Sequence, residues 1–182
     1  MRNRDSGDAA GTRSVRVFSV AVGAWLLVAS LFAQTTVVRP PWQAQVPDRQ
    51  VAQITVGTTP LAVELAITPE ERERGLGYRD GLEPGTGMLF LDTQARQQTF
   101  WMKGMRFCLD IVWIDGTQIV GAAENVCPMP AGTPDAQMPV YASPEPVQWV
   151  LEVPAGWMEA NGYAAGTPVD LSAVPSQGSS TS

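Results

Sequence analysis

The chain has 182 residues, 45% of them hydrophobic, and its 12 basic and 18 acidic residues give a net charge of −6. Four of the basic and two of the acidic residues lie within the first 16 positions, so the rest holds eight basic and sixteen acidic residues. A domain this acidic repels phosphate backbones, which excludes nucleic acid as an expected partner. The absence of histidine excludes Ser-His-Asp and Cys-His mechanisms and removes the commonest zinc ligand.

Residues 17–33 form an uncharged apolar run that follows the N-terminal arginines. This arrangement is typical of a secretory signal peptide or an N-terminal signal-anchor, here residues 1–33. A membrane-spanning helix needs about 20 apolar residues, with a lower limit near 17, so the length of the run does not decide between the two. The positive-inside rule places the rest of the chain outside the cytoplasm, either secreted or anchored to the cell membrane by this run.

The exported part divides into three segments. Residues 34–53 contain two adjacent prolines and show no periodicity, which favours a spacer. Residues 172–182 are rich in serine and are expected to form a disordered tail. The globular domain is therefore expected at residues 54–171.

The domain begins with a predicted strand at residues 62–67. Thr68 then has the character of a helix N-cap, Pro69 suits the first helical position, and Glu71 completes a capping box. These signals predict a short helix. A second short apolar strand is expected at residues 87–91.

The strongest strand signal is a hairpin formed by residues 109–114 and 117–123. Asp115-Gly116 between them is well suited to a two-residue type I′ turn. A strand at 147–153, a short helix at 156–161 and a closing strand at 168–171 are expected to follow. Together these elements predict a mainly β (α+β) fold, a compact small β-barrel-like domain with one or two short helices.

Several motifs of the chain resemble one known family. They are Thr68-Pro-Glu-Glu-Arg72, Arg74-Gly-Leu-Gly-Tyr-Arg79, Gly87-Met-Leu-Phe90, Phe100-Trp-Met-Lys103, Leu109-Asp-Ile-Val-Trp-Ile-Asp115, Glu124-Asn-Val126 and Val150-Leu-Glu-Val-Pro-Ala-Gly156. Because these motifs occur together and in this order, the chain resembles the family named domain of unknown function 192, which is widespread in bacteria and archaea. The resemblance implies a small, mainly β fold, often behind a signal sequence. It implies no activity, because none is firmly assigned to the family.

The chain departs from that family at Cys108 and Cys127, where other residue types are usual. An exported protein with just two cysteines favours one disulfide bond, and the alternatives are free thiols or two small buried hydrophobic residues. An ideal turn at Asp115-Gly116 would pair residue 108 with residue 123. Cys127 would then lie four residues past the register, and the bond would require the chain to bend back after Glu124.

Asp110 is the first candidate site residue, because it interrupts an otherwise apolar strand. A carboxylate there is expected to be partly buried and to need a partner. Lys103 and Arg106 are the nearest cations in the sequence. A structural ion pair, or a carboxylate that accepts backbone N–H bonds at a turn, is favoured over an acid–base or ligand-binding group.

Trp101 and Lys103 are the second candidate, as an aromatic platform and a cation for an anionic or sugar-like ligand. Aromatic residues in a small β domain are more often part of the core. Glu124 and Asn125 follow the hairpin and are expected near this region. Asp110 with Glu124 would also form a carboxylate pair suited to hydrolysis.

These patterns leave three hypotheses open. The favoured one is a ligand- or protein-binding accessory module of the cell envelope, with no cofactor and with membrane contact through the N-terminal segment if it is uncleaved. The second is a carboxylate-dependent hydrolase that uses Asp110 and Glu124, and the third is a purely structural partner domain. A metal site is not expected, because the sequence contains no calcium-binding Asp-x-Asp-x-Asp-Gly loop.

Overall fold

The computed structural model describes residues 49–175. The predicted leader, most of the spacer and most of the tail lie outside these residues. The described elements follow in chain order: β1 Val51–Val56, β2 Thr59–Ala66, α1 Pro69–Arg74, β3 Thr86–Arg96, β4 Thr99–Phe100, β5 Leu109–Asp115, β6 Gln118–Val126, the 3-10 helix η2 Asp135–Gln137, β7 Tyr141–Ala142, β8 Val147–Pro154, α2 Trp157–Asn161 and β9 Val169–Asp170.

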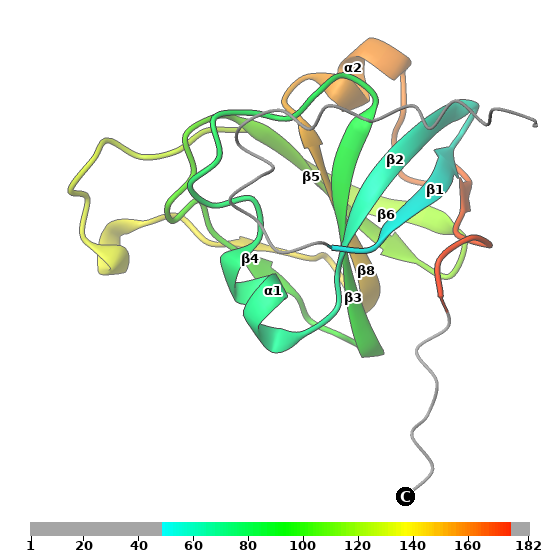
Figure 1. Cartoon of the computed structure of the whole chain (residues 1–182), viewed down its shortest axis with the longest axis horizontal. Coiled ribbons are helices and arrows are strands. Elements are labelled where there is room, and N and C mark those ends of the chain that lie inside the picture. The colour runs from blue at the N-terminus through cyan, green and yellow to red at the C-terminus, as the bar shows by residue number, and fades with distance from the viewer. Residues whose placement is uncertain (1–48, 176–182) are drawn as a thin grey trace, which may run out of the picture. The chain divides into compact units, whose positions relative to one another are not determined.

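Seven of these strands form one sheet in the order β6-β5-β8-β3-β2-β1-β9, and the sheet curls into a half-barrel (Figure 1). All neighbouring pairs are antiparallel except β2 and β3. A bridge between Gln118 and Pro168, with a hydrogen bond of 2.9 Å from the Ile119 N–H to the Thr167 carbonyl, brings β6 to the segment just before β9. The prediction of a small, mainly β, barrel-like domain with short helices is confirmed.

The sheet packs a hydrophobic cluster on each of its faces. The inner cluster includes Leu61, Leu89 and Leu151, and Met158 of α2 belongs to it. The outer cluster includes Phe90 and Val150 and is covered by segments that follow α1 and β4, which bring Leu76, Met102 and Met105. Figure 1 shows α1 and α2 near opposite ends of the domain. The outer face of the sheet is therefore covered mainly by irregular segments.

Helix α1 begins as its sequence predicts. The Glu71 N–H donates to the Thr68 hydroxyl at 3.2 Å, and the Glu71 carboxylate accepts from the Thr68 N–H at 2.8 Å. Burial alone would raise the pKa of Glu71, but hydrogen bonds from the backbone of Thr68 and Ile67 lower it. The helix ends at Gly75, whose φ of +48° suits glycine. The capping box thus fixes where the chain enters the cover of the sheet.

The hairpin of β5 and β6 differs from the expected register. Its turn residues are Gly116 and Thr117, because Asp115 pairs with Gln118. The later turn moves the pairing by two residues, and two bulges in the ladder move it by one residue each, four in all. One bulge falls at Glu124 and Asn125, where Asn125 has a φ of +52°, so the later turn and the two bulges together bring Cys127 opposite Cys108. The two cysteines form the expected disulfide bond, with their Cα atoms 4.1 Å apart.

Candidate functional site

A groove of about 260 Å³ opens on the outer face of the sheet. Its floor comes from β3 and β8, and its walls come from the end of α1 and from the chain on either side of β4. The charged and aromatic residues that line it are Arg72, Glu73, Arg74, Phe90, Asp92, Arg96, Phe100, Trp101, Lys103 and Glu152. Segments distant in sequence thus supply one concave surface with both charged and aromatic side chains.

Glu152 is the buried acid of the groove. It pairs with Met88 across the β3–β8 ladder, and Met88 pairs with Glu64 of β2, so the two carboxyls lie on one face of the sheet. Glu152 is only 6% exposed, and its buried Oε2 atom has no hydrogen-bond partner. Burial raises the pKa of Glu152 to about 8, against the opposing effect of Arg49 and Arg79. The side chain is therefore mainly a neutral acid at pH 7.

Two arginines beside Glu152 are engaged in other contacts. Arg79 is 3% exposed and donates two hydrogen bonds of 2.7 Å to the carboxylate of Glu64. Arg49 donates to the carbonyl oxygens of Glu71 and Gly75, both at 3.2 Å, and its Nε atom is buried without a partner. Burial, with the charge of Arg79, lowers the pKa of Arg49. These contacts hold the end of α1 against the sheet, and the positive charges of both arginines oppose the rise in the pKa of Glu152.

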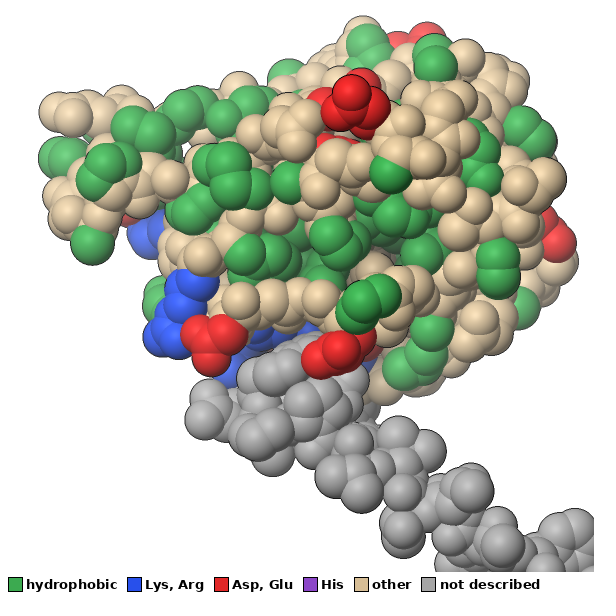
Figure 2. Space-filling view, turned by 90° about the horizontal axis from the view of Figure 1, so that it is seen from above, with side chains coloured by type: hydrophobic (Ala, Val, Ile, Leu, Met, Phe, Trp, Pro, Cys, Tyr) green, Lys and Arg blue, Asp and Glu red, His purple; other side chains and the backbone are tan. Residues whose placement is uncertain are grey.

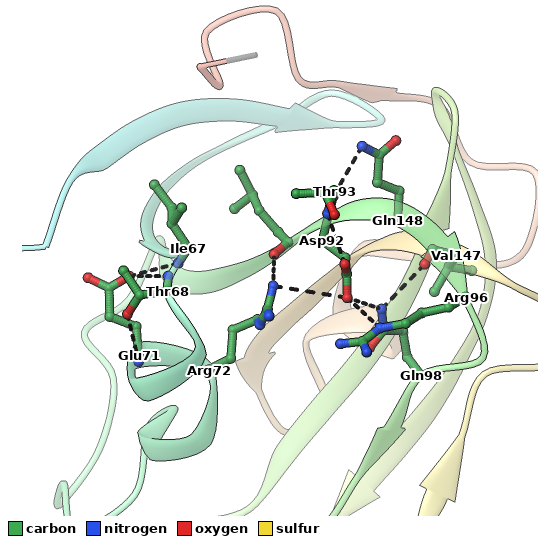
Figure 3. Close-up of polar contacts among 11 residues, drawn as sticks. Ile67, Thr68, Glu71, Arg72, Asp92, Thr93, Arg96, Gln98, Val147 and Gln148 are labelled. Atoms are coloured by element: carbon green, nitrogen blue, oxygen red, sulfur yellow. Dashed lines mark hydrogen bonds and ion pairs between the residues drawn. The ribbon is translucent and has the colours of Figure 1, made fainter. Parts of the chain in front are cut away.

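One side of the groove is a charge network around Asp92 (Figure 3). Arg72 reaches Asp92 from α1 at 4.0 Å, while Arg96 and Gln98 approach from the opposite side at 2.5 and 3.3 Å. Arg72 also donates to the Leu91 carbonyl at 2.7 Å. Burial alone would raise the pKa of Asp92, but the hydrogen bond from Gln98 and the two guanidinium groups lower it. Asp92 is thus an ionised carboxylate with its charge compensated.

The other side of the groove carries Trp101 and Lys103. The Lys103 ammonium lies 4.9 Å from the centroid of the Trp101 ring and 2.5 Å from a carboxylate oxygen of Asp135. The hydrogen bond to Asp135 raises the pKa of Lys103. Trp101 remains 44% exposed. This wall therefore presents an aromatic surface beside a paired cation.

Of the residues predicted for a site, the structure places two in this groove, Trp101 and Lys103. Arg106 is exposed and forms an ion pair with Asp80 at 2.7 Å. Glu124 and Asn125 are exposed on β6, and neither lines the groove. The six candidate residues thus do not share one surface.

Asp110 is fully buried and holds two backbone segments together. Its carboxylate accepts hydrogen bonds from the N–H groups of Asn125 at 2.8 Å, Gly156 at 3.1 Å and Met158 at 2.9 Å. Gly156 is the N-cap of α2 and has no side chain, so Asp110 supplies the capping oxygen from another strand. A catalytic pair of Asp110 with Glu124 stays a prediction, but Asp110 has no exposed surface with which to reach a substrate.

Glu152 was absent from the predicted site residues. The alternation of residues 147–153 predicts a half-buried strand, which would put Glu152 on a solvent-facing side. The structure instead covers that side with the segment after α1. One feature of the sequence could have pointed to Glu152: it stands among apolar residues in residues 150–156, one of the motifs that the chain shares with the family.

The described residues 49–175 contain no cluster of three histidine, cysteine or acidic side chains able to hold a metal ion. Within the same residues no helix has the length and apolar character needed to cross a membrane. The groove therefore offers hydrogen-bonding groups, paired charges and aromatic rings. Its strongest chemical feature is the neutral carboxyl of Glu152, a group suited to ligand binding or proton transfer near neutral pH.

Comparison with known proteins identifies related chains but no activity. The model of the family DUF192, described as "Uncharacterized ACR, COG1430", matches residues 52–171. A protein from Sinorhizobium meliloti 1021, described provisionally as a transcription regulator, is 30% identical with a TM-score of 0.61, over 69% of this chain and 96% of that chain. A protein of unknown function from Novosphingobium aromaticivorans DSM 12444 is 25% identical with a TM-score of 0.60, over 72% and 97%. No curated protein matches the chain.

Proposed function

The chain belongs to the family of domain of unknown function 192, and from that premise we propose that it is a small-ligand-binding module that acts outside the cytoplasm. The observation that carries this proposal is Glu152, a buried carboxyl with an unpartnered oxygen at a groove of about 260 Å³. Leaving a buried polar atom without a hydrogen bond costs about 1–3 kcal/mol. Glu152 lines the groove and is 6% exposed, so a rotation of its carboxyl that brought this oxygen to a ligand hydroxyl or amine would remove the cost.

The extracytoplasmic part of the proposal is supported by two features. Residues 17–33 have the pattern of a secretory leader or anchor. The bond between Cys108 and Cys127 is of a kind that persists in oxidising compartments.

The description of the S. meliloti protein as a transcription regulator is not extended to this chain. The described residues hold seven basic and fifteen acidic side chains. On the face shown in Figure 2, acidic side chains are scattered, whereas the basic ones gather at one edge. An acidic surface opposes the phosphate contacts on which DNA binding depends.

A ligand screen read by thermal unfolding tests the proposal. Metabolite and glycan libraries are screened with the unaltered chain, with Glu152→Met and with the exposed control Glu124→Gln. Methionine removes the carboxyl but fills similar space, so Glu152→Met is expected to fold. A ligand at 100 times its Kd stabilises the fold by about 2.7 kcal/mol. This shift should be kept in Glu124→Gln and lost in Glu152→Met; an empty screen, or equal shifts in all three proteins, would refute the proposal.

A further inference from the structure

The groove above Glu152 continues into a second, outer hollow of about 440 Å³. The two hollows share Glu73, Arg74, Trp101 and Lys103, and the outer one adds Tyr78. They therefore form one continuous groove, which we call the Tyr78–Glu152 groove. The volumes of the two hollows together lie within the range of about 300–1,000 Å³ that is usual for ligand pockets.

Two aromatic side chains stand exposed along the Tyr78–Glu152 groove. Tyr78 is 65% exposed and Trp101 is 44% exposed. Tyr78 has a φ of +66°, a conformation that non-glycine residues rarely adopt and that concentrates at functional sites. A hydrogen bond of 2.8 Å from the Tyr78 N–H to the Gly104 carbonyl holds it there, with its ring against Gly104. The fold thus keeps a strained backbone that presents an aromatic ring to solvent.

The charges around the groove compensate one another. Asp92 lies between Arg72 and Arg96, and Lys103 is paired with Asp135. Glu70, Glu73 and Arg74 also line the outer hollow, so with Asp135 beside Lys103 there are four cations and four carboxylates besides Glu152. The two arginines beside Glu152, Arg49 and Arg79, have the carboxylates of Glu64 and Glu71 as neighbours. Since Glu152 is mainly neutral, the groove has no net charge to attract an ion. Paired charges can still exchange strong hydrogen bonds with hydroxyl groups.

We propose that the ligand of this groove is a neutral carbohydrate, a short oligosaccharide whose rings lie against Tyr78 and Trp101 and from which one hydroxyl reaches Glu152. A sugar ring has an apolar face of C–H groups that suits an exposed aromatic ring, and a rim of hydroxyls that suits paired charges. Glu152 then gains the hydrogen bond that it lacks. This inference rests on the proposed ligand-binding function and names its ligand class.

The test is titration calorimetry on the full-length chain in a sugar-free detergent such as lauryldimethylamine oxide. The neutral probes are maltotetraose, cellotetraose and tetra-N-acetylchitotetraose; tetragalacturonate and unacetylated chitotetraose are the anionic and cationic comparators. The variants are Trp101→Ala, Glu152→Met and Tyr78→Asn, in which asparagine tolerates the positive φ. Val140→Ala, 61% exposed and outside the groove, is the control.

We expect at least one neutral tetrasaccharide to bind, with each aromatic variant weakening binding about tenfold and Val140→Ala leaving it unchanged. Binding of a charged comparator alone, lost in Glu152→Met, would overturn the neutral-carbohydrate inference while preserving a binding function. Saccharide binding that neither aromatic variant weakens would overturn the placement in this groove. No saccharide binding at all would also overturn the inference, and the broader screen would then decide the proposed function separately.

Discussion

The buried carboxyl of Glu152 predicts an unusual dependence of stability on pH. Its pKa is 4.5 in the ordinary state and about 8 in the fold. The folded protein therefore holds a proton that the unfolded chain has released between these two values, so stability falls as pH rises through this window. Below pH 4.5 both states are protonated, and above pH 8 both are ionised, so the change is confined to the interval between them.

The size of the effect follows from the two pKa values. A difference of about 3.5 at 1.36 kcal/mol per pKa unit gives a total loss of about 5 kcal/mol across the whole window. Between pH 5.5 and 7.5 the loss is about 2–3 kcal/mol. The chain has no histidine, and the pKa values of Asp92 and Glu71 are lowered, which moves their titration below this interval. No histidine therefore titrates in this interval, and Asp92 and Glu71 stay ionised through it.

Urea unfolding at several pH values between 5.5 and 7.5 measures this loss. Glu152→Gln keeps the shape of the neutral acid and cannot ionise, so its free energy of unfolding should stay nearly constant. The unaltered protein and the exposed control Glu124→Gln should both lose about 2–3 kcal/mol. Equal pH slopes in Glu152→Gln and the unaltered protein would show that Glu152 is ionised in the fold, and the description of the groove as uncharged would fail.

Three further predictions concern stability. Changing both Cys108 and Cys127 to serine should lower the free energy of unfolding by about 3 kcal/mol, measured by urea unfolding, because the bond closes a loop with a sequence separation of 19; two reactive thiols in the non-reduced, denatured protein would contradict the bond itself. Asp110→Ala should lower the free energy of unfolding by at least about 3 kcal/mol, because it leaves three backbone N–H groups without their acceptor. Asp110→Asn should lower it by less, and a decrease below about 0.5 kcal/mol in both variants would contradict the capping role. Thr68→Ala should lower the free energy of unfolding, again measured with urea, by about 1 kcal/mol, because it removes the hydroxyl that caps α1. An unchanged urea midpoint would show that the capping box does not stabilise the fold.

Local signals predicted much of the fold. The capping box at Thr68 and Glu71 depends only on neighbouring residues, and the structure reproduces it. Apolar runs, alternation and turn signals predicted six of the strands but missed β1, β4 and β7, and the predicted strands indicated a barrel-like sheet. The pairing of the two cysteines was also expected, and the bulge after Glu124 is part of its cause, but the later turn and the second bulge were not expected. The two bulges that align Cys108 with Cys127 depend on packing along the whole hairpin, which a local pattern does not contain.

The chemistry of the site was harder to predict, because it depends on contacts between distant residues. Asp110 caps a helix that begins 47 positions further along the chain, at Trp157. Alternation along β8 shows which residues share a face with Glu152, but it does not show that the segment after α1 covers that face. The exposed position of Tyr78 could not be predicted for the same reason, because its positive φ accompanies a hydrogen bond to the distant residue Gly104.

Glu152 is difficult to explain as a purely structural residue. Arg79 has a bidentate partner in Glu64, and Arg49 is bonded to the end of α1, so Glu152 is not their only compensation. A buried neutral acid with an unpartnered oxygen destabilises the fold, increasingly so toward alkaline pH. An apolar residue of similar size would pack at the same place without this penalty. Such a destabilising group at a groove is expected where binding, rather than folding, requires it.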